Sequence, residues 1–310
     1  MNLNKDCTVV ITTFFSGEKL DQCLSSIPEN YPIVVIDNGC EGEKKNLYEK
    51  KFKNLNYIIP KENLGIPRSY SFALSFVKTR FMFQTQPDVI VKKNCIENLL
   101  EASSKYPNAG ILTPIIFDNE KYSVKSDYKI LKYKNNKLID IKLKYFNASY
   151  DRPPEGDLSV DAVTATAMLI DTDKIKKIND WDKNIFAYYE DMDICLRLRF
   201  LGYEILKIKN AEVNHDPFSS HDIAFEEKLD FSRNWHYSWS SFYFFKKHGS
   251  LIYAYKFGVF LLISSFFKCL VYFLFNKKKH KTHLSKFLGI LNSMLNLKSY
   301  FRPNIQNKKF

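Results

Sequence analysis

Short apolar runs alternate with amphipathic stretches at the start of the chain. A β-branched run at residues 8–13 precedes an amphipathic stretch at 18–27, and a second apolar run at 33–37 precedes a charged, helix-like stretch that ends near residue 53. Apolar runs this short are typical of buried strands, and the intervening stretches are long enough for helices. The order predicts strand–helix–strand units and therefore a parallel sheet.

The same alternation continues to residue 116. It predicts strands at 56–59, 80–85 and 109–116, and helices at 67–78 and 93–105. We expect an α/β fold with a mostly parallel sheet and helices on both faces. In such sheets ligands bind beyond the carboxyl ends of the strands.

Residues 117–158 interrupt this pattern with a segment rich in Lys, Tyr, Asp and Asn. An Asn135-Asn136 turn within it could join two short strands between about residues 129 and 142. The segment closes with Pro153-Pro154-Glu155-Gly156. We interpret it as a flap-like surface insertion.

Apolar sequence then returns and completes a first domain over residues 1–216. The pattern predicts an apolar strand at 160–170, a short helix at 172–178, a loop at 179–189, a helix at 190–201 that Gly202 terminates, and a strand at 203–208.

The remaining residues, 217–310, differ in kind and predict a helical membrane-association region. Aromatic residues crowd positions 234–245, and residues 257–275 are apolar except for Lys268 and two serines. A spanning helix needs about 20 apolar residues. Basic clusters at 246–248 and 277–281 favour instead a helix in the membrane plane, with its lysines at the lipid phosphates. A transmembrane span and a buried helix of a soluble protein are the alternatives.

The overall charge also favours an anionic partner. The chain has 46 Lys and Arg against 34 Asp and Glu, a net charge of +12. The basic residues do not form the motifs of nucleic-acid-binding modules, so we expect an anionic membrane surface and no nucleic acid. The six cysteines lack a CxxC pair and the first residues are polar, which indicates a reduced compartment and no signal peptide. We therefore expect the cytoplasmic face of the cell membrane.

An acidic cluster opens the predicted helix at 190–201. Asp193 and Arg197 lie one helical turn apart and should pair, which leaves Glu190 and Asp191 at the helix N-terminus. These two carboxylates could simply cap an exposed helix. The aromatic lead-in at 186–189 and the apolar character of the helix favour a functional role, and the cluster alone leaves both interpretations open.

Two further residues could bind a metal ion. Asp88 follows a predicted strand in the sequence Gln86-Pro87-Asp88, where its carboxylate could hold the divalent cation that a diphosphate leaving group requires. His215 precedes Asp216 and could complete that metal site. The alternatives are a turn aspartate and a loop histidine without a ligand.

Polar residues after the first strands could bind a nucleotide. Thr12 and Thr13 end the first strand, and Asp37 and Asn38 end the second. A strand-end aspartate can accept hydrogen bonds from a base or ribose, although Asp-Asn-Gly is also a common turn. Arg68 follows an Asn-Leu-Gly loop at a predicted helix start, where it could meet a phosphate.

The order and spacing of these motifs resemble family 2 glycosyltransferases, in particular the branch of rhamnosyltransferases and galactofuranosyltransferases. The resemblance covers about residues 7–216, and its most specific element is Glu-Asp-x-Asp-x-x-Leu-Arg at 190–197. The motifs that carry it are Val-Val-Ile-Thr-Thr-Phe at 9–14, Val-Val-Ile-Asp-Asn-Gly at 34–39, Asn-Leu-Gly at 63–65, Gln-Pro-Asp-Val at 86–89 and that acidic element.

The resemblance implies a GT-A fold, a nucleotide-diphosphate sugar donor, a divalent cation (Mn²⁺ or Mg²⁺) and inversion at the anomeric carbon. It implies that Asp191 is the general base and that Glu190 binds sugar hydroxyls. It further implies a metal ion on Asp88 and His215 and a donor site formed by Thr12, Thr13, Asp37, Asn38, Arg68 and Gln86.

The chain departs from the family pattern at two positions. Gln86 stands where the family often has Asp or Asn, which leaves Asp88 as the single carboxylate of the metal motif, and Ser71 replaces a usual Asn. We expect an inverting transferase of rhamnose or a related hexose that acts on a glycan or lipid-linked acceptor in capsule, O-antigen or cell-wall biosynthesis. The alternatives are a noncatalytic membrane-bound scaffold of the same fold and a nucleotidyltransferase.

Overall fold

The protein divides into two compact units in a computed structural model. The described residues are 4–123, 126–130, 133–134, 137–138, 143–145, 152–216 and 225–302. The sheet unit comprises residues 1–131, 142–182 and 190–222, and the helical unit comprises residues 132–141, 183–189 and 223–310. The expected division at residue 216 stays a prediction, because residues 217–224 lie outside the described residues.

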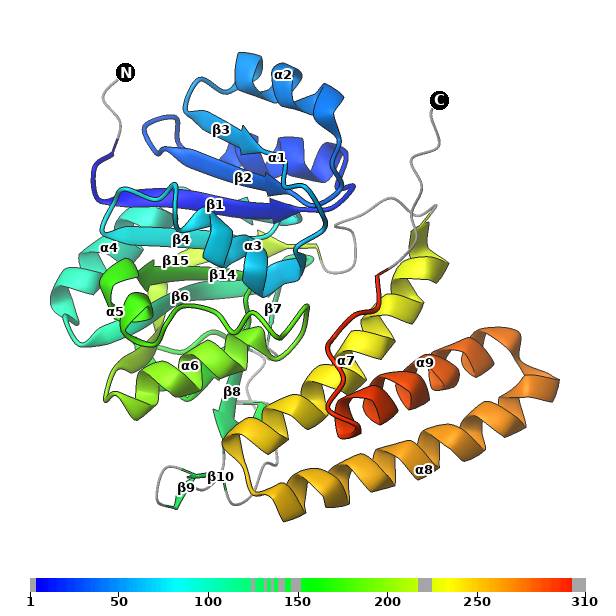
Figure 1. The fold of residues 1–310 in the computed structure, drawn as a ribbon. Coiled ribbons are helices and arrows are strands. Elements are labelled where there is room, and N and C mark those ends of the chain that lie inside the picture. Colours follow the sequence, from blue (N-terminus) through cyan, green and yellow to red (C-terminus); the bar gives the residue numbers. More distant parts are fainter. Residues whose placement is uncertain are drawn as a thin grey trace. The chain divides into compact units, whose positions relative to one another are not determined.

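A ten-stranded mixed sheet forms the centre of the sheet unit (Figure 1). Its main path runs β12-β15-β6-β14-β4-β1-β2-β3, with β5 paired to β15 and β7 paired to β6. The strands are β1 Cys7–Thr13, β2 Ile33–Asp37, β3 Leu55–Ile58, β4 Phe81–Thr85, β5 Val89–Val91, β6 Ala109–Asp118, β7 Lys121–Tyr122, β12 Leu158–Val160, β14 Ala167–Asp171 and β15 Glu204–His215.

The predicted parallel arrangement holds for most of the long strands. β1 pairs in parallel with β2 and β4, β2 with β3, and β6 with β15. β14 lies antiparallel between β4 and β6, so these two strands also point the same way. The carboxyl ends of β1, β2, β4, β6 and β15 therefore share one edge of the sheet, and the beginning of β14 lies at that edge.

Helices cover the sheet, and their bounds agree with the predicted ones to within a few residues. They are α1 Glu18–Ser26, α2 Gly42–Lys51, α3 Gly65–Ala73, α4 Cys95–Lys105, α5 Thr172–Lys177 and α6 Glu190–Phe200. α3 contacts β1 and β2, and α4 contacts β6, β14 and β15. Figure 1 shows α3 in front of the sheet and α4 behind it. Gly202 adopts φ 84° after α6 and so ends that helix as predicted.

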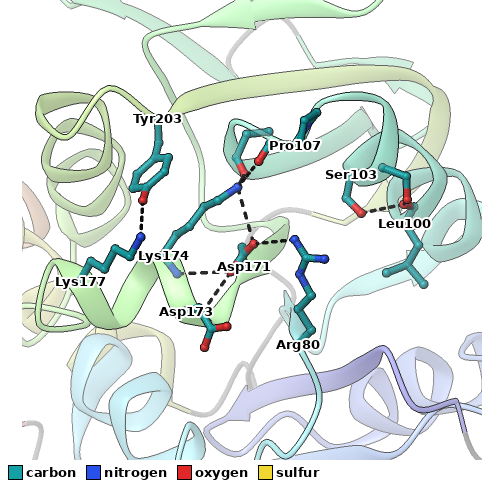
Figure 2. Close-up of polar contacts among 11 residues, drawn as sticks. Arg80, Leu100, Ser103, Pro107, Asp171, Asp173, Lys174, Lys177 and Tyr203 are labelled. Atoms are coloured by element: carbon teal, nitrogen blue, oxygen red, sulfur yellow. Dashed lines mark hydrogen bonds and ion pairs between the residues drawn. The ribbon is translucent and has the colours of Figure 1, made fainter.

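The amino edge of the sheet is fastened by a polar cluster at the start of α5 (Figure 2). The Asp171 carboxylate caps the helix by accepting hydrogen bonds from the backbone N–H groups of Asp173 and Lys174. Arg80 contacts the same carboxylate at 3.5 Å, and Lys174 donates to the Pro107 carbonyl at 2.6 Å. These contacts stabilise the edge opposite the candidate site.

The insertion at 117–158 is only partly a surface flap. The two short strands that we expected there pair with each other, β9 Tyr133–Lys134 with β10 Lys137–Leu138, and the Asn135-Asn136 turn itself lies outside the described residues. A second small sheet joins β8 Asp127–Ile130 with β11 Leu143–Tyr145 and β13 Ala162–Val163. Asp127 is fully buried in an ion pair with Lys207. The surface interpretation is therefore wrong for the start of the insertion, which a buried charge pair anchors to β15.

The helical unit contains α7 Glu226–His248, α8 Leu251–Phe275 and α9 Lys277–Met294. The aromatic residues predicted near 234–245 lie on α7, where Trp235, Trp239 and Phe242 are buried. Residues 296–302 fold back along this helix: Trp239 Nε1 donates to the Leu297 carbonyl at 3.0 Å. Figure 1 shows α8 and α9 side by side as a hairpin.

Candidate active site

Most of the predicted site residues come together at the carboxyl edge of the sheet. Thr13 at the end of β1 pairs with Asp37 at the end of β2. Asp88 follows the neighbouring strand β4, and His215 ends β15. The N-terminus of α6 joins the same edge, because the Ala165 backbone N–H, two residues before β14, donates to Asp191 Oδ2 at 3.3 Å.

The nucleoside end of the predicted donor site is formed by a rigid turn. Asp37 is fully buried, and its two carboxylate oxygens accept hydrogen bonds from the backbone N–H groups of Gly39 at 2.9 Å and Glu41 at 2.8 Å. A Cβ on Gly39 would meet Phe15 N at 3.2 Å, so the turn is closely packed. The Asp-Asn-Gly sequence thus forms a turn, as its residue types also predicted, and the turn fixes the Asp37 carboxylate in place. Thr13 Oγ1 donates to Ser16 at 2.8 Å in the loop beside it.

Asn38 joins this turn to the start of α3. Its amide Nδ2 donates to Ser69 Oγ at 2.9 Å, and its Oδ1 accepts from the Leu64 backbone N–H at 2.9 Å. Asn38 therefore orients the loop that precedes Arg68. Arg68 forms an exposed ion pair with Glu62 at 2.8 Å. Solvent screens this pair, so a phosphate could take the place of the Glu62 carboxylate beside Arg68.

Asp88 and His215, the predicted metal ligands, lie close together. His215 Nε2 lies 3.7 Å from Asp88 Oδ2, and within the described ranges no group donates a hydrogen bond to the buried Asp88 Oδ1. Asp118, at the end of β6, accepts from His215 Nδ1 at 2.8 Å. A carboxylate behind an imidazole orients the other ring nitrogen for metal binding. Burial raises the pKa of Asp88, and the nearby His215 opposes that rise. These oxygen and nitrogen donors fit a divalent cation.

A cavity of about 180 Å³ opens beside this pair. Lys19 on α1 reaches it and contacts Asp216 Oδ2 at 2.7 Å, while the Asp216 backbone N–H donates to the Asp88 carbonyl at 3.0 Å. A cationic side chain therefore lies on the same cavity as the candidate metal ligands. The cavity is lined by Lys19, Gln22, Pro87, Asp88, Ile90, Asn119, Glu120, Asn214, His215 and Asp216.

Glu190 and Asp191 form the acidic pair at the start of α6. Glu190 is 5% exposed, and among the described residues none donates a hydrogen bond to its Oε2. Burial and the adjacent Asp191 raise the pKa of Glu190. Burial also raises the pKa of Asp191, but the backbone N–H groups of Met192 and Ala165 stabilise its charged form. The backbone donors thus favour the ionised form of Asp191, whereas burial and the neighbouring charge favour the protonated form of Glu190.

Tyr70 on α3 is buried beside the ends of β1 and β4. Its hydroxyl donates to the Thr85 carbonyl at 3.2 Å, and Thr12 Oγ1 lies 3.5 Å away. Burial raises the pKa of Tyr70, and the charges of Glu190 and Asp88 add to that effect.

The predicted pair of Asp193 and Arg197 is present and fixes α6 in place. Arg197 Nε donates to Asp193 Oδ2 at 2.8 Å, and Arg197 NH1 donates to the carbonyls of Ile178 and Asp180 at 2.6 and 2.7 Å. One guanidinium thus joins the helix to the loop after α5. The acids of the cluster divide between structure, in Asp193, and the candidate site, in Glu190 and Asp191.

The chain reaches Glu190 through two tyrosines in an unusual backbone conformation. Tyr188 and Tyr189 have φ values of 68° and 67°, a region that costs a bulky residue on the order of 1–3 kcal/mol. Both belong to the helical unit, where the Tyr189 ring packs against Phe244 at 5.2 Å and Tyr237 at 5.5 Å between centroids. Aromatic packing on α7 thus stabilises the strained segment directly before the acidic pair.

Several residues of this site were missed in the sequence. Asp118 ends a strand at the same edge, so the rule that led to Asp37 and Asp88 could also have found it. Lys19 and Tyr70 lie inside predicted helices, and their polar contacts depend on how those helices pack. Gln86 is half-buried beside Asp88, and its predicted donor contact stays a prediction.

The comparisons with known proteins identify the family. The profile described as glycosyl transferase family 2 matches residues 8–162, half of the chain. Rhamnosyltransferase WbbL of Escherichia coli (strain K12) is 24% identical over 217 residues, which cover 66% of this chain and 79% of that protein. N-acetylglucosaminyl-diphospho-decaprenol L-rhamnosyltransferase of Mycobacterium tuberculosis is 21% identical over 229 residues, which cover 67% and 75%.

Solved structures agree on the fold. The mannosyltransferase PcManGT from Pyrobaculum calidifontis, in complex with GDP-Man and Mn²⁺, has a TM-score of 0.54 at 9% identity and covers 95% of this chain and 90% of that chain. GalNAc-T7 with UDP, GalNAc and Mn²⁺ has a TM-score of 0.55 at 14% identity, covering 68% of this chain and 43% of that chain. Both likenesses concern the nucleotide-sugar transferase fold, GT-A. With the match to the family profile, they show that this chain is a glycosyltransferase and belongs to glycosyl transferase family 2.

Proposed function

We propose that this chain transfers rhamnose or a related hexose, with inversion, from a nucleoside-diphosphate sugar to a hydroxyl of a glycan or lipid-linked acceptor. The observation that carries the proposal is that a carboxylate base, Asp191, and a metal-ligand pair, Asp88 and His215, occur at one edge of the sheet. The two rhamnosyltransferase relatives support the choice of sugar.

Asp191 would act as the general base. As the acceptor oxygen attacks the anomeric carbon, its proton passes to the Asp191 carboxylate, and the bond between that carbon and the diphosphate oxygen breaks with its electron pair on the leaving group. The Ala165 N–H, which already donates to Asp191, keeps the carboxylate oriented. Glu190, beside it, would hold a sugar hydroxyl through its unpaired Oε2.

The donor would lie along the carboxyl ends of β1, β2 and β4. Asp37, with Thr12 and Thr13, would contact the nucleoside, Asn38 would hold the neighbouring loop, and Arg68 and Gln86 would face the phosphates. Asp88 and His215 would hold a divalent cation, Mn²⁺ or Mg²⁺, which neutralises charge on the diphosphate when bound. Within the described ranges no three His, Cys, Asp or Glu side chains form a metal cluster, so the diphosphate would supply further ligands.

The helical unit and one relative support the proposed acceptor and location. α8 has 25 residues and a mean hydropathy of 2.1, long and apolar enough to cross a membrane, and it is the single helix of that kind in the described part of the chain. One relative is named for a lipid-linked substrate. We therefore place the enzyme at the cytoplasmic face of the cell membrane, in cell-surface polysaccharide biosynthesis, with residues 217–310 as its membrane-association region.

The test is a transfer assay with the purified full chain. Nucleoside-diphosphate rhamnose, galactofuranose and glucose are each offered with N-acetylglucosaminyl-diphospho-polyprenol, with Mn²⁺ or Mg²⁺, and the lipid product is measured. Rhamnosylated lipid is the expected product. Donor binding without transfer or hydrolysis of any donor would favour the noncatalytic scaffold. The match to glycosyl transferase family 2 favours a glycosyltransferase over the nucleotidyltransferase alternative.

A further inference from the structure

One side of α8 is exposed and is apolar over most of its length, with Lys256 near its start. In its most apolar 18-residue window 11% is buried, although the mean hydropathy there is 2.1. The exposed side chains include Ile252, Val259, Phe260, Ile263, Phe267, Leu270, Val271 and Leu274. They recur three, four or seven positions apart and therefore form one continuous stripe along the helix. A stripe of this length on a folded chain marks a surface that another apolar medium covers.

The opposite side of α8 consists of small residues that pack closely within the helical unit. Ala254, Gly258 and Ser265 are its buried positions. A Cβ on Gly258 would meet the Phe242 ring of α7 at 2.8 Å. α8 therefore has a fixed protein face and a fixed outer face, and it cannot rotate about its axis to bury the stripe.

α9 runs antiparallel along nearly the whole of α8. Near the start of α8, the Tyr255 hydroxyl donates to the Met294 carbonyl at 3.5 Å, and near its end His280 Nδ1 donates to the Cys269 carbonyl at 3.0 Å. Between these points the rings of Phe266 and Phe287 lie 5.8 Å apart. The two helices form one hairpin whose turn is Asn276.

The composition of α9 decides how this hairpin can meet a bilayer. Its first turns carry Lys277, Lys278, Lys279 and Lys281, and Lys286 follows. If α8 crossed the bilayer, α9 would have to cross with it or separate from it. A spanning hairpin would place Lys268, inside α8, and Lys286, midway along α9, within the membrane, where charged side chains are costly. Separation of the two helices would expose the packed small-residue face. A spanning α8 is therefore incompatible with this hairpin.

We propose that α8 lies in the plane of an anionic bilayer, with its apolar stripe among the acyl chains and α9 on the water side. The inference rests on the membrane location in the proposed function and deepens it. Positive charge gathers at the hairpin turn and at Lys268 on α8, where it matches anionic headgroups. Lys256 lies within the outer face near the start of α8, and its long stem can carry the ammonium to the headgroups.

The first experiment measures binding of the full chain to vesicles by flotation. Vesicles of phosphatidylcholine alone are compared with vesicles that also contain phosphatidylglycerol. We expect binding to the anionic vesicles, at least about tenfold weaker for the double variant Phe260→Glu/Phe267→Glu. Leu47→Glu, at an exposed apolar position on α2, is the matched control and should bind like the wild type. Equal binding of the double variant, or no vesicle binding, would overturn the proposal.

The second experiment separates the in-plane helix from a span. Cys40 and Cys269 are replaced by serine, and single cysteines are introduced as Lys247→Cys and Lys278→Cys, before and after α8. A membrane-impermeant maleimide added to one side of sealed vesicles should label both positions. Labelling of only one of them would establish a span and contradict the proposal.

Two other outcomes are distinguishable. A stable dimer that hides the stripe in solution and fails to bind vesicles would make a second copy of the chain its occupant and overturn the membrane proposal. Donor hydrolysis measured without vesicles tests the proposed function separately. If the chain binds vesicles but hydrolyses no donor, the proposed transfer reaction is contradicted and the proposed membrane surface is not.

Discussion

His215 Nδ1 and Asp118 Oδ1 lie 2.8 Å apart, so the imidazole is held with its other nitrogen toward Asp88. This relationship predicts that Asp118, although no metal ligand itself, controls metal affinity. Asp118→Ala should weaken apparent Mn²⁺ binding by about 10- to 100-fold. Thermal shift during Mn²⁺ titration with a nucleoside diphosphate present measures it. Asp173→Ala removes an exposed carboxylate on α5 as the control, and an unchanged Mn²⁺ midpoint in Asp118→Ala would refute the role.

Glu190 predicts a pH-dependent stability. The pKa of Glu190 is raised in the folded state. Between the ordinary pKa of a glutamate and this raised pKa, the folded protein therefore keeps a proton that the unfolded chain has released. The free energy of unfolding falls as pH rises through the raised pKa. Glu190→Gln removes this cost. Below about pH 4, the ordinary range of a glutamate, the free energy of unfolding of the variant should match that of the wild type. In alkaline solution it should exceed the wild-type value by about 1–3 kcal/mol.

Urea midpoints measured across this pH range provide the test. Glu101→Gln, at an exposed position on α4, should follow the wild type at every pH. A Glu190→Gln curve parallel to the wild-type curve would mean that Glu190 ionises normally.

Lys19 predicts a contact with the donor's diphosphate. Its ammonium, held by Asp216, lines the same cavity as Asp88 and His215. Lys19→Met keeps the stem and removes the charge, so nucleoside diphosphate should bind about tenfold more weakly while the free nucleoside binds as before. Calorimetry with both ligands measures the difference. Lys50→Met, at an exposed position on α2, is the control. Equal diphosphate affinity in Lys19→Met would exclude the contact.

Gly289 predicts a stability effect in the helical unit. A Cβ at this position would overlap the Trp235 carbonyl, because α7 and α9 approach closely there. Gly289→Ala should lower the free energy of unfolding by about 1–3 kcal/mol, since backbone atoms must move to make room. Gly156→Ala, where no atom lies within 4 Å of the added Cβ, should change the free energy of unfolding by less than about 0.5 kcal/mol. Thermal unfolding of both variants measures the effect, and equal melting temperatures would disprove the close approach.

Much of the fold could be predicted because its strands are short apolar runs and its helices are periodic. The pairing of β9 with β10, the end of α6 at Gly202 and the pairing of Asp193 with Arg197 are local features, and all three are confirmed. The direction of β14 was not predictable, because an apolar run looks the same in either direction. The ion pair of Asp127 and Lys207 was missed because its partners lie 80 residues apart in the chain.

Some residues of the candidate site could likewise be predicted from the local sequence, and others could not. Strand-end carboxylates such as Asp37 and Asp88 could be read from the sequence, because the edge that they share follows from the fold class. Lys19 and Tyr70 could not, since their roles depend on which helix face meets the site. The in-plane position of α8 was already favoured by the basic clusters in the sequence and stays a proposal. The structure adds the packing of α9 along α8, which the sequence did not predict.

Transfer by Asp191→Asn, compared with the wild type, tests the central claim most directly. The substitution keeps the size of the side chain and its contact with the Ala165 N–H but removes the base. The account predicts that rhamnosyl transfer to the lipid-linked acceptor falls by about 10²- to 10⁴-fold while nucleoside-diphosphate affinity and melting temperature stay unchanged. Transfer at the wild-type rate would contradict the assignment of Asp191 as the catalytic base.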